Sequence, residues 1–408
     1  MVTDKLMSKS IPFRLSDARG LLRLGCDATV GITDLVEQMH LTISHWALPI
    51  GRPRRGRTTG ITGAVYGTVR GVTRLTARGL DSSLRRFEHP DRSSPTSARR
   101  DATLAVVNGI WGDHLASTGN PLAIRMAVRL RGRDVDLSAE GLKSAVPQAS
   151  GRIALLIHGL CMSDRQWRRN GHDHGEMLAR ELGYTTLALN YNSGRHISEN
   201  GEQLAALLEK LVSCWPVPVD ELVIVGHSMG GLVARSACHA AECRSLKWRH
   251  RLTRLVFLGT PHHGAALERG GHLVDSLFEV SPYAAPFARL GKARSAGITD
   301  LRFGNVQRAD WEHRHAHDQR HDDRVPTPLP AGVDVYCIAA TTAEKPRGLR
   351  HALLGDGLVS LASAWGEHRE ERLALAVPAS HKTLVTQAGH LDLLSRAEVA
   401  QALERWLA

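Results

Sequence analysis

A serine between two glycines is the strongest chemical signal in this sequence. Residues 221–232 read ELVIVGHSMGGL, so a run of buried-strand type leads directly into a G-x-S-x-G motif centred on Ser228. The chemistry needs small residues on both sides because the strand-to-helix turn is tight, and this turn exposes the serine oxygen at a helix N-terminus. We predict that Ser228 is a nucleophile. The alternative is a serine that only caps the following helix.

A nucleophilic serine requires two main-chain N–H groups that stabilise the negative charge developing on the substrate oxygen. The residue after the nucleophile, Met229, is expected to supply one of them. The second is expected from Leu160, because residues 153–164 (IALLIHGLCMSD) form a strand followed by a His-Gly turn. By itself, this segment is better explained as an ordinary His-Gly turn that ends a strand.

The acid and the base of a catalytic triad should follow the serine in the order Asp or Glu, then His. Asp356 lies between two glycines in GDGLVS, on a turn from which it could orient an imidazole. Glu344 is the alternative acid, and a plain Asp-Gly turn is the alternative reading of Asp356. His390, just before the C-terminal helix, is the expected base, because one imidazole can accept a proton and then return it. His381 is the alternative base.

Five motifs occur in a fixed order: HGLCMSD, VGHSMGG, FLGTPHHGA, GDGLVS and GHLDLL. Together they resemble the α/β-hydrolase lipases and esterases, in particular the proteins grouped with the hydrolase domain of GPI inositol-deacylase. The resemblance covers about residues 150–408. It implies the same roles: nucleophile for Ser228, acid for Asp356, base for His390, and oxyanion donors at Leu160 and Met229.

The resemblance also implies the position of a substrate pocket. Residues 258–264 (LGTPHHG) end the strand expected beside the nucleophile strand, and they are expected to line the pocket. The predicted pocket residues are His158, Gly159, His227, His262 and His263.

We expect no cofactor and no metal. Secreted bacterial lipases similar to this chain bind calcium through an aspartate just after the histidine and a glutamine one turn later; here Asp392 matches but Arg396 replaces the glutamine. Histidines also cluster with aspartates in residues 313–323 and 172–174, a combination that metal sites use. In polar segments rich in arginine, this pattern is more typical of solvated surface.

The elements that must position these residues alternate along the chain. Strand-like runs alternate with helical ones, which predicts an α/β-hydrolase fold with a mostly parallel, doubly wound sheet. The runs of strand type are 152–157, 185–191, 221–226, 253–259, 333–340 and 372–378, and the helical runs are 173–182, 199–213, 229–243 and 395–407. Residues 262–330 interrupt the alternation and are expected to form an insertion, or lid, over the carboxyl edge of the sheet.

The first 95 residues form a basic helical extension, and residues 96–408 the hydrolase domain. The whole chain of 408 residues carries a formal net charge of +11, yet residues 1–100 alone hold 17 Lys and Arg against 8 Asp and Glu. Apolar residues recur at spacings of three and four in 15–46 and 59–87, the pattern of amphipathic helices. Residues 89–100 (HPDRSSPTSARR) are expected to be a linker.

Composition excludes several classes of protein. Hydrophobic residues at 42% and charged residues at 23% argue against collagen, a long coiled coil and disorder. Six cysteines without a CxxC pair indicate free thiols in a reducing compartment, and no signal-like or membrane-spanning run is present, so we expect a cytoplasmic protein. The positive charge alone would suit nucleic acid, but the N-terminal arginines lack interleaved aromatic residues and nucleic acid is not expected.

The expected function is therefore hydrolysis of a lipid or other hydrophobic carboxylic ester through an acyl-enzyme. An acyltransferase would use the same residues, with an alcohol in place of water. A different alternative is a membrane-docking protein in which residues 15–87 make peripheral contact with anionic lipid and the hydrolase domain serves as a scaffold.

Overall fold

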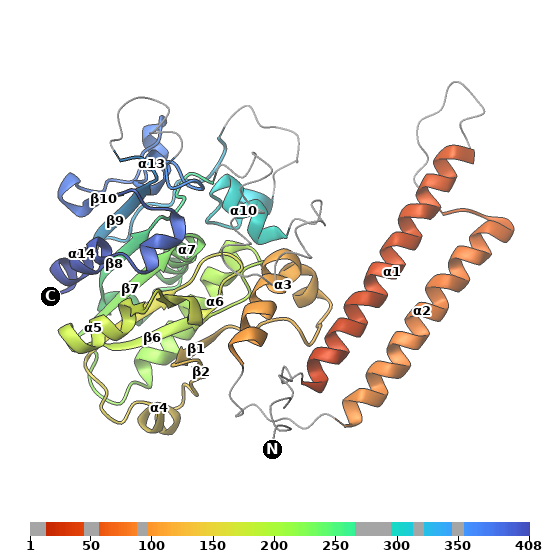
Figure 1. Ribbon diagram of the computed structural model, residues 1–408, viewed down its shortest axis with the longest axis horizontal. Helices are drawn as coiled ribbons and strands as arrows, with labels where there is room; N and C mark the ends of the chain where they lie inside the picture. Colours follow the sequence, from red (N-terminus) through yellow and green to blue (C-terminus); the bar gives the residue numbers. More distant parts are fainter. Residues whose placement is uncertain (1–13, 45–56, 88–96, 266–294, 313–321, 345–354) are drawn as a thin grey trace, which may run out of the picture. The chain divides into compact units, whose positions relative to one another are not determined.

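The computed structural model describes residues 14–44, 57–87, 97–265, 295–312, 322–344 and 355–408 (Figure 1). The chain divides into two compact units, residues 1–94 with 115–123 and residues 95–114 with 124–408. The helices of the described residues are α1 (Leu15–Ser44), α2 (Gly60–Arg86), α3 (Ala98–Ser117), α4 (Ala139–Ala145), α5 (His174–Leu182), α6 (Ile197–Ser213), α7 (Met229–Cys243), α10 (Ala296–Phe303), α11 (Ala309–Glu312), α13 (Leu361–Ala364) and α14 (Ala397–Leu407).

An eight-stranded sheet with the order β10-β9-β8-β7-β3-β6-β1-β2 forms the centre of the second unit. Its strands are β1 (Ala127–Leu130), β2 (Arg133–Asp134), β3 (Arg152–Ile157), β6 (Thr185–Asn190), β7 (Glu221–His227), β8 (Leu252–Leu258), β9 (Asp334–Thr341) and β10 (Lys382–Thr386). From β6 to β10 all neighbours are parallel, whereas β1 pairs antiparallel with both β6 and β2. The predicted mostly parallel sheet is confirmed.

Helices cover both faces of this sheet, and strand β3 illustrates why its sequence is apolar throughout. Alternate side chains of a strand point to opposite faces. Leu155 joins the core formed with α6 and α7, and Leu156 joins the core formed with α5 and α14 (Figure 1). A strand buried on both sides therefore needs a continuous apolar run rather than an alternating one.

The prediction of a last strand at residues 372–378 is wrong. Leu373, Leu375 and Val377 are buried and alternate with exposed residues, but the segment pairs with no neighbouring strand. Alternating burial only requires that one side of an extended segment is covered; it does not require a hydrogen-bonded partner. The strand that pairs with β9 is β10, which begins at Lys382.

Of two other predictions on element boundaries, one is corrected and the other lies partly outside the described residues. The predicted linker 89–100 ends earlier than expected, because α3 begins at Ala98. Within the predicted insertion 262–330, residues 266–294 and 313–321, which include the histidine cluster, lie outside the described residues.

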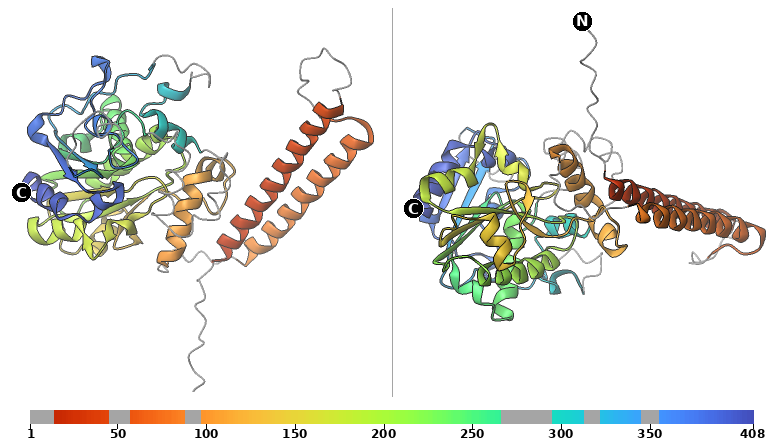
Figure 2. Two further views of the ribbon diagram at one scale, coloured as in Figure 1. Left: turned by 45° about the horizontal axis from the view of Figure 1, so that its top comes forward. Right: turned by 90° about the horizontal axis from the view of Figure 1, so that it is seen from below.

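Helices α1 and α2 of the first unit lie side by side as a hairpin (Figure 2). Both predicted amphipathic helices are confirmed, with ends within two residues of those expected. No helix among the described residues is both long and apolar enough to cross a bilayer.

Candidate active site

Ser228 is located where strand β7 ends and helix α7 begins, in a backbone conformation that side chains rarely adopt. Its φ is 53° and its ψ is −125°. The neighbouring glycines explain how the chain passes so closely: a Cβ on Gly226 would lie 2.7 Å from the Cα of Gly231, and one on Gly230 would clash with the carbonyl oxygen of Ile157. The sequence therefore folds into a sharp strand-to-helix turn only because these positions lack side chains.

Asp356 and His390 form a buried pair although they are 34 residues apart in the sequence. The Oδ2 of Asp356 lies 2.6 Å from the Nδ1 of His390, and each residue is only 5% exposed. The other carboxylate oxygen, Oδ1, accepts hydrogen bonds from the main-chain N–H groups of Leu358 and Val359 at 3.0 and 2.9 Å. The carboxylate is thus held from both sides, and it requires a proton on Nδ1 of the imidazole.

Because Nδ1 faces the carboxylate, Nε2 is the ring nitrogen of His390 that points away from Asp356. No hydrogen-bond partner for this buried nitrogen occurs in the described part of the chain. His227, the residue before Ser228, connects the serine turn with the segment of His390. The Nε2 of His227 lies 3.2 Å from the carbonyl oxygen of His390, and the two ring centroids are 4.8 Å apart. Ser228 and His390 are therefore neighbours, without a direct hydrogen bond between their side chains.

The two expected oxyanion donors lie on either side of Ser228. Met229 is the first residue of α7, and a Cβ on Gly159, which precedes Leu160, would lie 3.1 Å from the Cβ of Ser228. Neither the N–H of Leu160 nor that of Met229 has a hydrogen-bond acceptor within the described ranges. Two unused donors beside a serine at a helix N-terminus are suited to stabilise an anion.

The loop that carries Leu160 is held by residues that the sequence did not point to. Cys161, with φ of 58°, donates its N–H to the Oγ of Ser193 at 3.1 Å, and a Cβ on Gly109 of α3 would clash with the sulfur of Cys161. The hydroxyl of Tyr191 donates to the carbonyl oxygen of His158 at 2.9 Å. Nothing in the sequence marks Gly109 as a neighbour of this loop.

The histidines predicted to line the pocket are largely enclosed. His158, His227 and His262 are fully buried, and desolvation lowers the pKa of His158 to about 4 and that of His227 well below its usual value. Burial likewise lowers the pKa of His263 to about 4 and that of His262 strongly; His262 faces the guanidinium of Arg235 at 3.4 Å. These imidazoles are neutral at physiological pH, and they pack behind the site.

The alternative acid and base lie elsewhere. His381 precedes β10 instead of following the last strand, so it is at the opposite end of that strand from His390, and it stacks on Tyr336 with ring centroids 4.3 Å apart. Glu344 is exposed.

The residues compared with a calcium site make other contacts. Asp392 accepts a hydrogen bond from the N–H of Gly389 at 2.8 Å, and Arg396 donates to the carbonyl oxygen of Thr386. His172 and His174 pair with each other at 2.8 Å, and Asp173 caps α5. Among the described residues, no group of three or more His, Cys, Asp or Glu side chains is arranged to hold a metal ion.

One family model matches part of the chain. Residues 148–322 match the model of the PGAP1-like alpha/beta domain. The second unit has the α/β-hydrolase fold. The matched region includes Ser228, Leu160 and Met229, but it ends before Asp356 and His390, so the pairing of these two residues is visible only in the structure.

Solved structures of similar proteins are lipases and esterases. They include a mature lipase from Bacillus licheniformis, with 19% identity over 63% of this chain and 92% of that chain and a TM-score of 0.37. An esterase from Thermogutta terrifontis has 18% identity over 64% of this chain and 90% of its own, with a TM-score of 0.36. A search of curated proteins finds no match.

Proposed function

We propose that this α/β-hydrolase cleaves carboxylic esters through an acyl-enzyme on Ser228. The observation that carries the proposal is the buried Asp356–His390 pair, in which Nδ1 faces the carboxylate and Nε2 has no hydrogen-bond partner among the described residues. In the proposed reaction, Nε2 of His390 takes the proton of the Ser228 hydroxyl while the oxygen attacks the ester carbonyl.

Charge that develops on the carbonyl oxygen is stabilised by the N–H groups of Leu160 and Met229. His390 then gives its proton to the departing alcohol, and the acyl group remains on the serine. A water molecule, deprotonated by the same Nε2, attacks the acyl-enzyme and releases the carboxylic acid. Throughout this cycle the Asp356 carboxylate stays ionised and stabilises the imidazolium that forms twice.

Cysteine chemistry is not required at this site. The thiol of Cys161 lies next to the Leu160 donor, but burial raises its pKa to about 12, so that it stays protonated at neutral pH. A protonated thiol is a poor nucleophile. The serine hydroxyl with its neighbouring imidazole is the better candidate.

The preference for a lipid or other hydrophobic ester rests on the resemblance to lipases and esterases. The test is covalent labelling with a fluorophosphonate, followed by hydrolysis of p-nitrophenyl esters of increasing chain length. Wild type should be labelled and Ser228→Ala should not, with an unchanged melting temperature. Labelling of Ser228→Ala, or unaltered ester hydrolysis by it, would refute the proposed nucleophile. Added alcohols distinguish transfer from hydrolysis, because an acyltransferase forms a new ester.

A further inference from the structure

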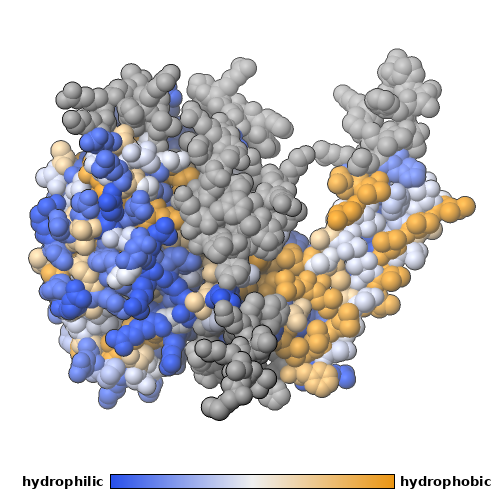
Figure 3. Space-filling model, viewed as in Figure 1, coloured by the Kyte–Doolittle hydropathy of each residue, from blue (hydrophilic) through white to orange (hydrophobic). Residues whose placement is uncertain are grey.

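The α1–α2 hairpin exposes an unusual amount of aliphatic surface. Of the thirteen large hydrophobic side chains that are exposed in the described part of the chain, eleven lie on this hairpin (Figure 3). Single exposed apolar residues are normal, whereas a concentrated set marks a surface that is covered in the working protein. The eleven residues are Leu21, Ile32, Leu35, Val36, Ile61, Val65, Val69, Val72, Leu75, Leu80 and Phe87.

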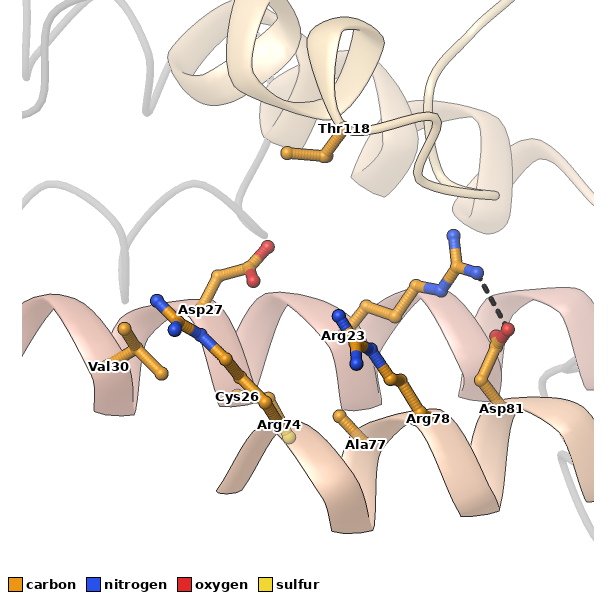
Figure 4. A pocket seen from close by; sticks show the side chains of 9 residues that line it. All are labelled: Arg23, Cys26, Asp27, Val30, Arg74, Ala77, Arg78, Asp81 and Thr118. Carbon is orange, nitrogen blue, oxygen red and sulfur yellow. Dashed lines mark hydrogen bonds and ion pairs between the residues drawn. The ribbon is translucent and has the colours of Figure 1, made fainter. Parts of the chain in front are cut away.

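The surface between the two helices is polar. Arg70 of α2 is ion-paired with Glu37 and, at 2.8 Å, with Asp34 of α1, and Arg19 of α1 pairs with Asp81 of α2 at 3.0 Å. Arg70 and Glu37 are only 4% and 2% exposed. These ion-paired side chains are therefore buried in the hairpin, and Arg23 also pairs with Asp81 at 2.6 Å (Figure 4).

Helix periodicity separates the polar and the aliphatic faces of α2. Ile61, Val65, Val69 and Val72 follow each other at intervals of four, four and three residues, which places them on one face. Arg70 and Asp81 are eleven residues apart, or about three turns, and share the face that meets α1. The hairpin therefore buries the ion-paired Arg70, Glu37, Arg19 and Asp81 and exposes a row of aliphatic side chains, whereas a hairpin that is stable in water buries its apolar face.

The charge of this region identifies what covers it. Between Glu37 and Asp81, residues 38–80 contain seven arginines and no aspartate, glutamate or lysine. Arg74 and Arg78 line a groove of about 260 Å³ beside Cys26 (Figure 4), and no carboxylate of the described residues forms an ion pair with either guanidinium. A second copy of the hairpin would bring like charges together, whereas an anionic surface would neutralise them.

We propose that the α1–α2 hairpin docks on the surface of an anionic lipid bilayer. Its outer aliphatic side chains enter the boundary between headgroups and acyl chains, and the guanidinium groups of Arg74 and Arg78, exposed at the groove between the two helices, bind lipid phosphates. The helices, of 30 and 27 residues, lie along the surface, because neither is apolar enough to cross. This inference does not depend on the proposed ester hydrolysis.

The test is flotation of the full chain with vesicles of phosphatidylcholine alone or with 30% phosphatidylglycerol, at low and high salt. Wild type should float with the anionic vesicles, and high salt should weaken its binding. The triple variant Val65→Ser, Val69→Ser, Val72→Ser should bind about 100-fold more weakly. The double variant Arg74→Gln, Arg78→Gln should bind roughly 25-fold more weakly, with most of the preference for anionic lipid lost.

Matched controls replace the exposed valines outside the hairpin. Val217→Ser, Val325→Ser should bind vesicles as the wild type does, and all variants should keep the wild-type helical circular dichroism. The proposal is overturned if wild type does not float with anionic vesicles or if both hairpin variants bind normally. It is also overturned if mass measurement without lipid finds an oligomer that the triple valine variant dissociates, because the aliphatic face then belongs to a second copy.

Discussion

Replacing Asp356 by asparagine tests the active site most sharply, because the structure determines how the new side chain must lie. The Oδ1 position accepts two main-chain N–H groups, from Leu358 and Val359, so the amide oxygen of asparagine must occupy it. The amide NH2 then faces Nδ1 of His390, which becomes an acceptor. The imidazole proton moves to Nε2, and the nitrogen beside Ser228 can no longer take the serine proton.

The size of the effect follows from the interactions that are lost. In the variant, the tautomer with its proton on Nδ1 places the N–H of His390 against the NH2 group of the asparagine, and these two buried donors cost about 1–3 kcal/mol. In addition, the imidazolium loses its hydrogen bond to a carboxylate, which is worth about 1.5–3 kcal/mol. Together these two terms amount to about 2.5–6 kcal/mol, which lowers kcat/KM by about 10²-fold to 10⁴-fold, a range that includes the loss seen when a triad aspartate becomes asparagine. The turn keeps its two hydrogen bonds, so the free energy of unfolding should change by less than about 1 kcal/mol.

The assay is p-nitrophenyl ester hydrolysis, with fluorophosphonate labelling rates and urea denaturation measured on the same samples. Glu344→Gln is the matched control, because it removes the alternative acid from an exposed position, and its activity should equal that of the wild type. If Asp356→Asn kept more than a tenth of the activity, or if Glu344→Gln lost as much as Asp356→Asn, the assignment of the acid would be refuted.

Three further predictions concern the framework around the site. Gly230→Ala should lower the free energy of unfolding by more than about 3 kcal/mol, because the new Cβ meets a carbonyl oxygen of β3. Gly67→Ala, in open space on α2, should raise it by up to about 1 kcal/mol. Equal melting temperatures of the two variants would contradict this. The pKa of His158 and that of His174 are lowered by burial to about 4, so the unfolded chain binds more protons than the folded one. These two histidines alone should lower the stability by roughly 3 kcal/mol per pH unit as the pH drops from 6.5 toward 4, and a flat urea midpoint over that range would disprove it. In native protein, Cys161 should resist a thiol reagent until unfolding, and rapid native labelling identified by mass spectrometry would be inconsistent with its burial.

Local features of the sequence predicted the serine turn and most strands. The glycines around Ser228 permit a tight turn that side chains would block, and the apolar runs of β3, β7 and β8 are typical of buried strands. These signals involve neighbours in the chain, and a linear pattern can report them. The same reasoning located α1 and α2, because the spacing of apolar residues repeats with the helix.

The last strand was harder to predict from the sequence, because a segment becomes an edge strand only when it pairs with a neighbouring strand. Residues 372–378 and 382–386 both resemble edge strands, and only the second meets β9. That choice places His381 before the last strand and His390 after it.

The sequence by itself determined the fold class, the turn at Ser228, the order of the motifs and the concentration of positive charge near the N-terminus, because each depends on residues close together in the chain. Only the tertiary structure decided that Asp356 holds His390, that Gly109 and Ser193 support the loop of Leu160, and that the α1–α2 hairpin encloses its charges. Those facts depend on contacts between distant segments, and the pattern within any one segment is the same whichever partner it meets.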